Sequence, residues 1–216
     1  MGWITRTFSS SIGKKILMAA SGSFLGLFVL VHLAGNSSSL LGRTTFLAYA
    51  DHLHSLGSLT TVFEILLLIT FCAHVTLALL LFFENRRARP ERYAVVKSRG
   101  ESTLASQTML YSGIVILIFL AVHLQNFHFI TQKPPLADLL RTTLHNPVVG
   151  SFYIIGVLSL GLHLSHGFWS LFQTLGLAHP KYTRTLDKKA ALFGLAVGLL
   201  FALIPILALF FPGFLR

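Results

Sequence analysis

The chain contains almost no cysteine. Of its 216 residues, the one cysteine is Cys72, which lies within an apolar run. A single thiol can build neither a disulfide framework nor a cysteine-based zinc or iron–sulfur site. Any metal held by this chain must therefore have other ligands.

Charged residues are scarce as well. They make up 11% of the chain, against 54% hydrophobic residues and a mean hydropathy of +0.73. A soluble domain carries more charge than this, so the composition predicts a membrane protein. In a soluble chain, 17 Lys and Arg against 7 Asp and Glu would suggest nucleic-acid binding, but here the basic residues are sorted by side of the bilayer. We therefore exclude nucleic acid as a partner.

The chain contains several long apolar segments with few charged residues. A helix needs about 20 apolar residues to cross a bilayer. The chain has no repeat and no separate domain, so the sequence predicts an all-α integral membrane protein, a single five-transmembrane-helix bundle over residues 1–216. The five predicted spans are 15–36, 60–83, 105–131, 148–175 and 190–211.

The basic residues indicate the orientation. Most of them precede the first span, follow the second or follow the fourth. By the positive-inside rule, the N-terminus is cytoplasmic and the C-terminus is outside. The basic connection 84–101 then either docks a cytoplasmic partner or only sets the topology.

Two outer connections also carry information. Residues 37–59, with Asp51, His52 and His54, are predicted to form a short amphipathic segment on the outer surface, whereas the proline-rich residues 132–147 are predicted to form an irregular loop.

Histidine is abundant, with ten residues in the chain. An ionisable side chain is costly in hydrocarbon, and helix packing does not require one on each of four helices, so these residues indicate function. Six of them fall within the predicted spans: His32, His74, His123, His128, His163 and His166.

Their depths suggest a cofactor. At 1.5 Å per residue, His32 and His123 lie about 6 and 13 Å from the outer ends of their spans, and His74 and His163 about 21 and 24 Å. Two levels of paired histidines predict bis-histidine ligation of two stacked haem groups. Zinc or a di-iron centre would need three or more converging ligands. The haems would be b-type because the chain has no CxxCH sequence.

Small residues within the spans either let helices pack closely or make room for a flat cofactor. Those expected to relieve a haem edge are Gly22, Ser23, Gly26, Ser112, Gly113, Gly156 and Gly161, and the one-turn pair Gly194 and Gly198 is a further candidate for close packing.

Some alternatives stay open within the sites. His128 competes with His123 at the outer level, and His166 shares a helix face with His163. We expect His123 and His163 to be the ligands. His166 would then bind a haem propionate or a quinone, or form a contact between helices. Glu64 either assists proton exchange or is a snorkelling interfacial group.

Four segments are distinctive: GSFLGLFVLVHLAGN, FLAYADHLHSLG, STLASQTMLYSGIVILIFLAVHL and, above all, LGLHLSHGFWSLFQTLG in the fourth span. Together with the His74 helix, they resemble the cytochrome b558 membrane subunit of succinate dehydrogenases and fumarate reductases. The resemblance covers nearly the whole chain. It is to the type in which one five-helix polypeptide carries two b haems.

The resemblance implies a multi-pass subunit of the cytoplasmic membrane that exchanges electrons with a menaquinone-type quinone. The implied partners are an iron–sulfur subunit and a flavoprotein subunit with FAD, which performs the succinate/fumarate chemistry on the cytoplasmic side. A dimer of such heterotrimers is left open. In this resemblance, His74 and His163 bind the inner haem, and His32 and His123 the outer one.

The chain departs from the family at one position. Some members carry a glutamate two residues before the helix-four ligand, where this chain has Gly161. Proton transfer by that route is therefore not expected. The candidates for the quinone site are Asp51, His52, His54 and Glu64.

Two other functions compete. The cytochrome b subunit of a hydrogenase or formate dehydrogenase also uses intramembrane histidines, but the HLSHGFWS segment argues against it. A haem-free membrane anchor or proton-relay transporter is disfavoured because this five-helix chain lacks related halves.

Overall fold

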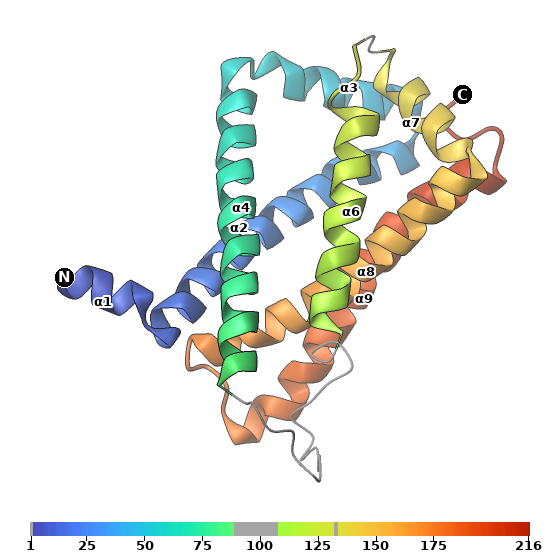
Figure 1. The fold of residues 1–216 in the computed structure, drawn as a ribbon. Helices are drawn as coiled ribbons and strands as arrows, with labels where there is room; N and C mark the ends of the chain where they lie inside the picture. The colour runs from blue at the N-terminus through green and yellow to red at the C-terminus, as the bar shows by residue number, and fades with distance from the viewer. Residues whose placement is uncertain (1, 89–107, 132–133) are drawn as a thin grey trace.

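Within the described residues, five helices are long and apolar enough to cross a membrane, as predicted (Figure 1). The computed structural model describes residues 2–88, 108–131 and 134–216, and every regular element within them is helical. The all-α, five-span fold class is thus confirmed. The long helices are α2 (Ser11–Ser37), α4 (Ser58–Arg87), α6 (Met109–Phe127), α8 (Pro147–Thr174) and α9 (Pro180–Phe210), and the short elements are α1 (Trp3–Ser9), η1 (Ser38–Leu41), α3 (Arg43–Ser55) and α7 (Leu136–His145).

Helices α8 and α9 form the most closely packed pair of the bundle, because glycines meet at their contact. A Cβ atom on Gly161 would lie 2.5 Å from the carbonyl oxygen of Gly194 and 3.0 Å from the Cα of Gly198. Only hydrogen side chains permit this approach. Gly161, Gly194 and Gly198 therefore serve helix packing and do not line space for a cofactor.

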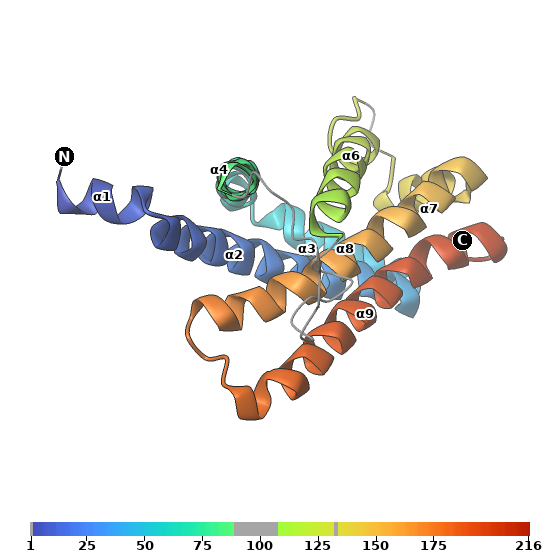
Figure 2. The same cartoon turned by 60° about the horizontal axis from the view of Figure 1, so that its bottom comes forward.

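Helix α4 contrasts with this pair. It packs mainly against α2 (Figure 2) and has no buried residue among those described, whereas 44% of the apolar stretch of α9 is buried. Its apolar side chains are thus covered by little of the described protein.

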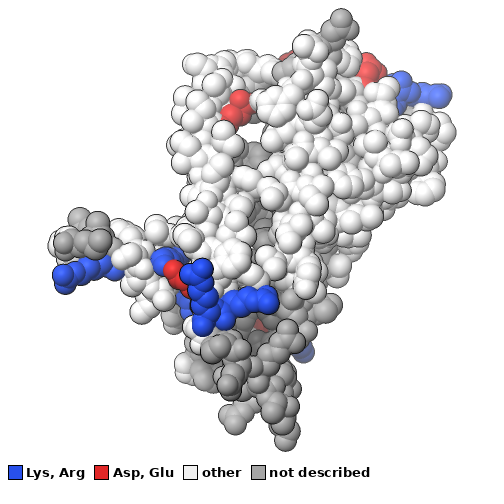
Figure 3. Space-filling model, viewed as in Figure 1, with Lys and Arg blue, Asp and Glu red and all other residues white. Residues whose placement is uncertain are grey.

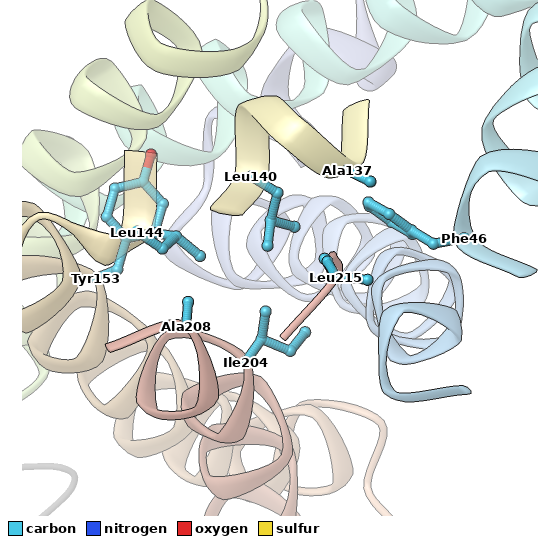
Figure 4. Packing of buried hydrophobic residues seen from close by; sticks show 8 residues of the cluster. All are labelled: Phe46, Ala137, Leu140, Leu144, Tyr153, Ile204, Ala208 and Leu215. Atoms are coloured by element: carbon cyan, nitrogen blue, oxygen red, sulfur yellow. The ribbon is translucent and has the colours of Figure 1, made fainter. Parts of the chain in front are cut away.

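Helices α3 and α7 and the C-terminus gather at one end of the molecule, which we call the α3/α7 end (Figure 1). Arg43 donates from both terminal nitrogens to the Asp138 carboxylate, at 2.6 and 2.7 Å, and also to the Leu215 carbonyl at 3.1 Å. The same elements also contribute to a buried apolar cluster, shown in Figure 4, of Phe46, Ala137, Leu140, Leu144, Tyr153, Ile204, Ala208 and Leu215.

The prediction of an irregular loop over 132–147 was wrong for most of its length. Residues Leu136–His145 form the amphipathic helix α7, whose Ala137 and Leu144 are buried. The prolines suggested a loop, but Pro135 caps the start of α7 and Pro147 begins α8, the position where proline suits a helix. The neighbouring region 37–59 does contain a short helix, α3, while its place on the outer surface stays a prediction.

Several span boundaries also differ from the prediction: the first helix begins at Ser11 and not at 15, and the second ends at Arg87 and not at 83. The fifth helix begins at Pro180 and not at 190, because the His179 side chain accepts a hydrogen bond from the Lys181 backbone N–H and starts a polar first turn. The third helix ends at Phe127 and not at 131, while residues 105–107 lie outside the described residues.

The opposite end of the molecule is basic. Lys and Arg side chains gather where α2 begins and α4 ends, and the surface between this basic end and the α3/α7 end is largely uncharged (Figure 3). Lys14 at the start of α2 forms an ion pair with Glu84 near the end of α4. The charge distribution suits a bilayer around the middle of the molecule. That the basic end faces the cytoplasm stays a prediction, and residues 89–101 of the expected basic connection 84–101 lie outside the described residues.

Candidate functional site

Four of the span histidines come together as two pairs inside the bundle. His32 on α2 and His123 on α6 have ring centroids 5.9 Å apart, with their planes at 88°. His74 on α4 and His163 on α8 have centroids 6.4 Å apart, with their planes at 68°. Each pair therefore joins helices that are distant in sequence.

The two pairs lie at different depths. His32 and His123 lie within about 8 Å of the helix ends that point to the α3/α7 end, at 1.5 Å per residue. His74 and His163 each lie sixteen residues from the start of a helix that begins at that end, which is about 24 Å along the axis. We call them the outer and the inner pair.

Aromatic rings surround the outer pair. Phe28 stacks on His32 at 5.3 Å between centroids, and Phe119 and Phe127 lie 5.7 and 5.3 Å from His123. Gly156 leaves space for the Phe119 ring. The Nδ1 atom of His123 is buried and has no hydrogen-bond partner among the described residues, so the outer pair is apolar and leaves one ring nitrogen unsatisfied.

Serines hold the inner pair. The Ser21 hydroxyl lies 3.1 Å from His74 Nδ1, and the Ser112 hydroxyl lies 3.3 Å from His163 Nδ1. The residue after each serine is a glycine that faces the same ring: a Cβ on Gly22 would lie 3.2 Å from His74 Cε1, and one on Gly113 would lie 3.7 Å from His163 Cε1. A Ser–Gly step on the neighbouring helix thus seats each inner ring.

Sequence reasoning missed Ser21 and chose its neighbour Ser23. The Ser23 hydroxyl is exposed and donates to the Ala19 carbonyl of its own helix. The repeated Ser–Gly dipeptide, once in α2 and once in α6, was the available signal. Of the other small residues named from the sequence, Gly26 has no atom within 4 Å of the position of a Cβ.

Neither of the two competing histidines is a ring partner in these pairs, although His166 lies one turn beyond His163 on α8. His128, just beyond α6, has its Nδ1 4.0 Å from the Glu64 carboxylate on α4, and both side chains are about half exposed. His166 has a buried Nδ1 without a partner among the described residues. The structure brings His123 beside His32, and His163 beside His74.

The outer polar candidates are not part of either pair. The side chains of Asp51, His52 and His54 on α3 are exposed and make no hydrogen bond or ion pair within the described part of the chain. Within those residues, no three His, Cys, Asp or Glu side chains converge in a way that could hold a metal ion. A metal bound at either pair would therefore receive two ligands from the described residues.

Comparison with known proteins gives one curated relative. No protein-family model and no solved structure matches the chain. The chain is 24% identical over 155 residues to the succinate dehydrogenase cytochrome b558 subunit of Bacillus subtilis (strain 168), a match that covers 71% of this chain and 74% of that protein. This match and the five apolar helices identify the chain as a multi-pass membrane protein distantly related to the succinate dehydrogenase cytochrome b558 subunit.

Proposed function

We propose that this chain is the membrane anchor and di-haem cytochrome b subunit of a succinate:quinone oxidoreductase or quinol:fumarate reductase of the cytoplasmic membrane. In this role it transfers electrons between a menaquinone-type quinone and the iron–sulfur subunit of its complex. The observation that carries the proposal is the pairing of four intramembrane histidines from four helices at two depths. The name of the curated relative, a cytochrome b558 subunit, supports haem b as the cofactor.

The histidine pairs fit two haem b groups. His32 with His123, and His74 with His163, would each hold one haem; their ring centroids are 5.9 and 6.4 Å apart. Neutral imidazole is an established ligand of haem iron. A porphyrin supplies four further nitrogens, so two protein ligands suffice. Helix α4, with no buried residue among those described, also has apolar surface for a flat apolar group to cover.

A haem held by two histidines supplies one-electron oxidation and reduction. The residues of the chain hold and tune it. His32 and His123 would hold the outer haem in an aromatic setting that excludes water, and His74 and His163 would hold the inner haem with their rings fixed by serines. The polarity around each ligand pair sets the potential of the group it holds.

Quinone chemistry also needs proton exchange, and the proposal assigns it to the α3/α7 end. Glu64 and His128, a carboxylate and an imidazole 4.0 Å apart and half exposed, are a pair able to pass protons between water and a quinone near the outer histidines. Asp51, His52 and His54 on the exposed face of α3 stay the other candidates. The basic end would receive the iron–sulfur and flavoprotein subunits, on which the succinate/fumarate chemistry takes place.

The test is the haem content of the intact complex. The chain is purified with its partners from detergent-solubilised membranes, and haem b per polypeptide is measured by the pyridine haemochrome assay. Two haems per chain, together with a copurifying flavoprotein that oxidises succinate or reduces fumarate, are the expected result. A folded preparation without haem overturns the proposal, and haem without such a flavoprotein reassigns the chain to another electron-transfer complex.

A further inference from the structure

We infer that Ser21 and Ser112 are positioning residues that fix His74 and His163 with Nδ1 protonated and Nε2 free to bind a metal. By this contact they also lower the potential of the group held at the inner pair. The inference rests on the proposed function, since it concerns the haem that these two histidines would hold. It assigns roles to two side chains that touch only the ligands.

Each of the two serine hydroxyls donates its proton to a backbone carbonyl of its own helix. The Ser21 hydroxyl donates to the Met18 carbonyl at 3.1 Å, and the Ser112 hydroxyl donates to the Met109 carbonyl at 3.0 Å. A hydroxyl has one proton to donate and two lone pairs with which to accept. Because that proton is used within the helix, each serine oxygen accepts from the histidine beside it.

The contact with serine determines which ring nitrogen of His74 and of His163 carries the proton. A neutral imidazole has one protonated nitrogen, so donation by Nδ1 leaves the lone pair on Nε2. The contacts of His74 with Ser21 at 3.1 Å and of His163 with Ser112 at 3.3 Å thus select the same tautomer on both rings. Gly22 and Gly113 let the rings approach the neighbouring helix closely enough for these bonds.

The outer pair differs from the inner pair in the hydrogen bonding of its ring nitrogens. The buried Nδ1 of His123 has no acceptor within the described residues, and aromatic rings surround it. A hydrogen bond from Nδ1 increases the basicity of the ligand and favours the more positive ferric iron. The serines should therefore lower the potential at the inner pair, while no such contact acts on His123.

The experiment uses Ser21→Ala and Ser112→Ala in the purified full complex. The matched control is Ser23→Ala, which removes an exposed hydroxyl two residues from Ser21 whose bond stays within its own helix. Ser21→Thr restores a hydroxyl and serves as the rescue variant. Redox titration of the haem absorption gives two midpoint potentials, and the inner one is identified as the component lost in His74→Leu.

We expect both alanine variants to retain their haem and to raise the inner midpoint potential, with a larger rise in the double variant. The outer midpoint potential should not change in the alanine variants. In Ser23→Ala and Ser21→Thr, both midpoint potentials should equal those of the unchanged protein. Unchanged inner potentials in both alanine variants, in a complex that still binds two haems, overturn the inference and leave the proposed function intact. Absence of haem from the unchanged protein overturns the proposed function itself.

Discussion

The rings of His32 and His123 lie perpendicular to one another with centroids 5.9 Å apart, although the residues belong to the first and third spans. If they are ligands of one haem, His32→Leu and His123→Leu should each halve the haem content, and both should remove the same spectral component. The measurement is the pyridine haemochrome assay with low-temperature spectra. His128→Leu is the control, because His128 contacts Glu64 instead, and it should keep the full haem content.

The inner pair should behave as a second, independent unit. His74→Leu and His163→Leu are expected to halve the haem content by removing the other component, since the inner haem would lose one of the two histidines that would hold it. His166→Leu is the control one turn further along α8. Equal loss of both components from every single variant would contradict the assignment of ligands to pairs.

Glu64 should matter for quinone turnover and not for haem binding. Loss of a general acid–base group costs about 100-fold or more in rate where it acts directly on the substrate, and Glu64→Gln keeps the shape while removing the charge. Quinol oxidation by the purified complex is the measurement. If Asp51→Asn lowers this rate and Glu64→Gln does not, the proton-exchange site belongs to α3.

The α8–α9 contact should be sensitive to a single methyl group. Gly161→Ala places a carbon 2.5 Å from the Gly194 carbonyl oxygen, so the helices must separate, at a cost of about 1–3 kcal/mol. Gly26→Ala is the matched control, because a Cβ there meets no atom within 4 Å. Thermal unfolding in detergent, followed by circular dichroism, should show a lower midpoint for the first variant only.

The Arg43–Asp138 ion pair should make stability depend on pH in acid. Hydrogen bonds from Arg43 lower the pKa of the Asp138 carboxyl below its ordinary value of 3.8. A carboxyl whose pKa is lower in the folded state binds its proton more readily when unfolded, so its contribution is complete above pH 3.8 and is lost as the pH falls further. Asp138→Asn should remove this part of the pH dependence and lower the unfolding midpoint at pH 7. A variant with unchanged acid dependence would exclude Asp138 as its source.

Hydropathy and charge were sufficient to predict the fold class, because each span is a local property of about 20 residues. The helix α7 was missed because Pro135 and Pro147 were interpreted as loop residues, although Pro135 immediately precedes α7 and Pro147 begins α8. The Arg43–Asp138 ion pair joins residues 95 positions apart, and no local pattern reports such a contact.

The candidate site was predictable in part. The depths of the histidines along their helices predicted the pairs His32–His123 and His74–His163, and the rings of each pair lie side by side in the structure. Their role as haem ligands stays a prediction. Ser21 was missed because depth counts residues along a helix and does not say which face meets the neighbouring helix. Only the packing of α2 against α4 distinguishes Ser21 from Ser23.

The absence of a side chain at Gly161 also bears on whether the proposed reaction moves net charge across the membrane. The contact with Gly194 and Gly198 leaves no room there for a carboxyl group that could carry a proton alongside an electron, if electrons pass between the inner and the outer histidine pair as proposed. An electron that crosses the membrane without such a proton exchanges about 2.3 kcal/mol with every 100 mV of membrane potential. In sealed vesicles, quinone turnover by this protein would then respond to the voltage across the membrane, and collapsing that voltage with an ionophore would change its rate.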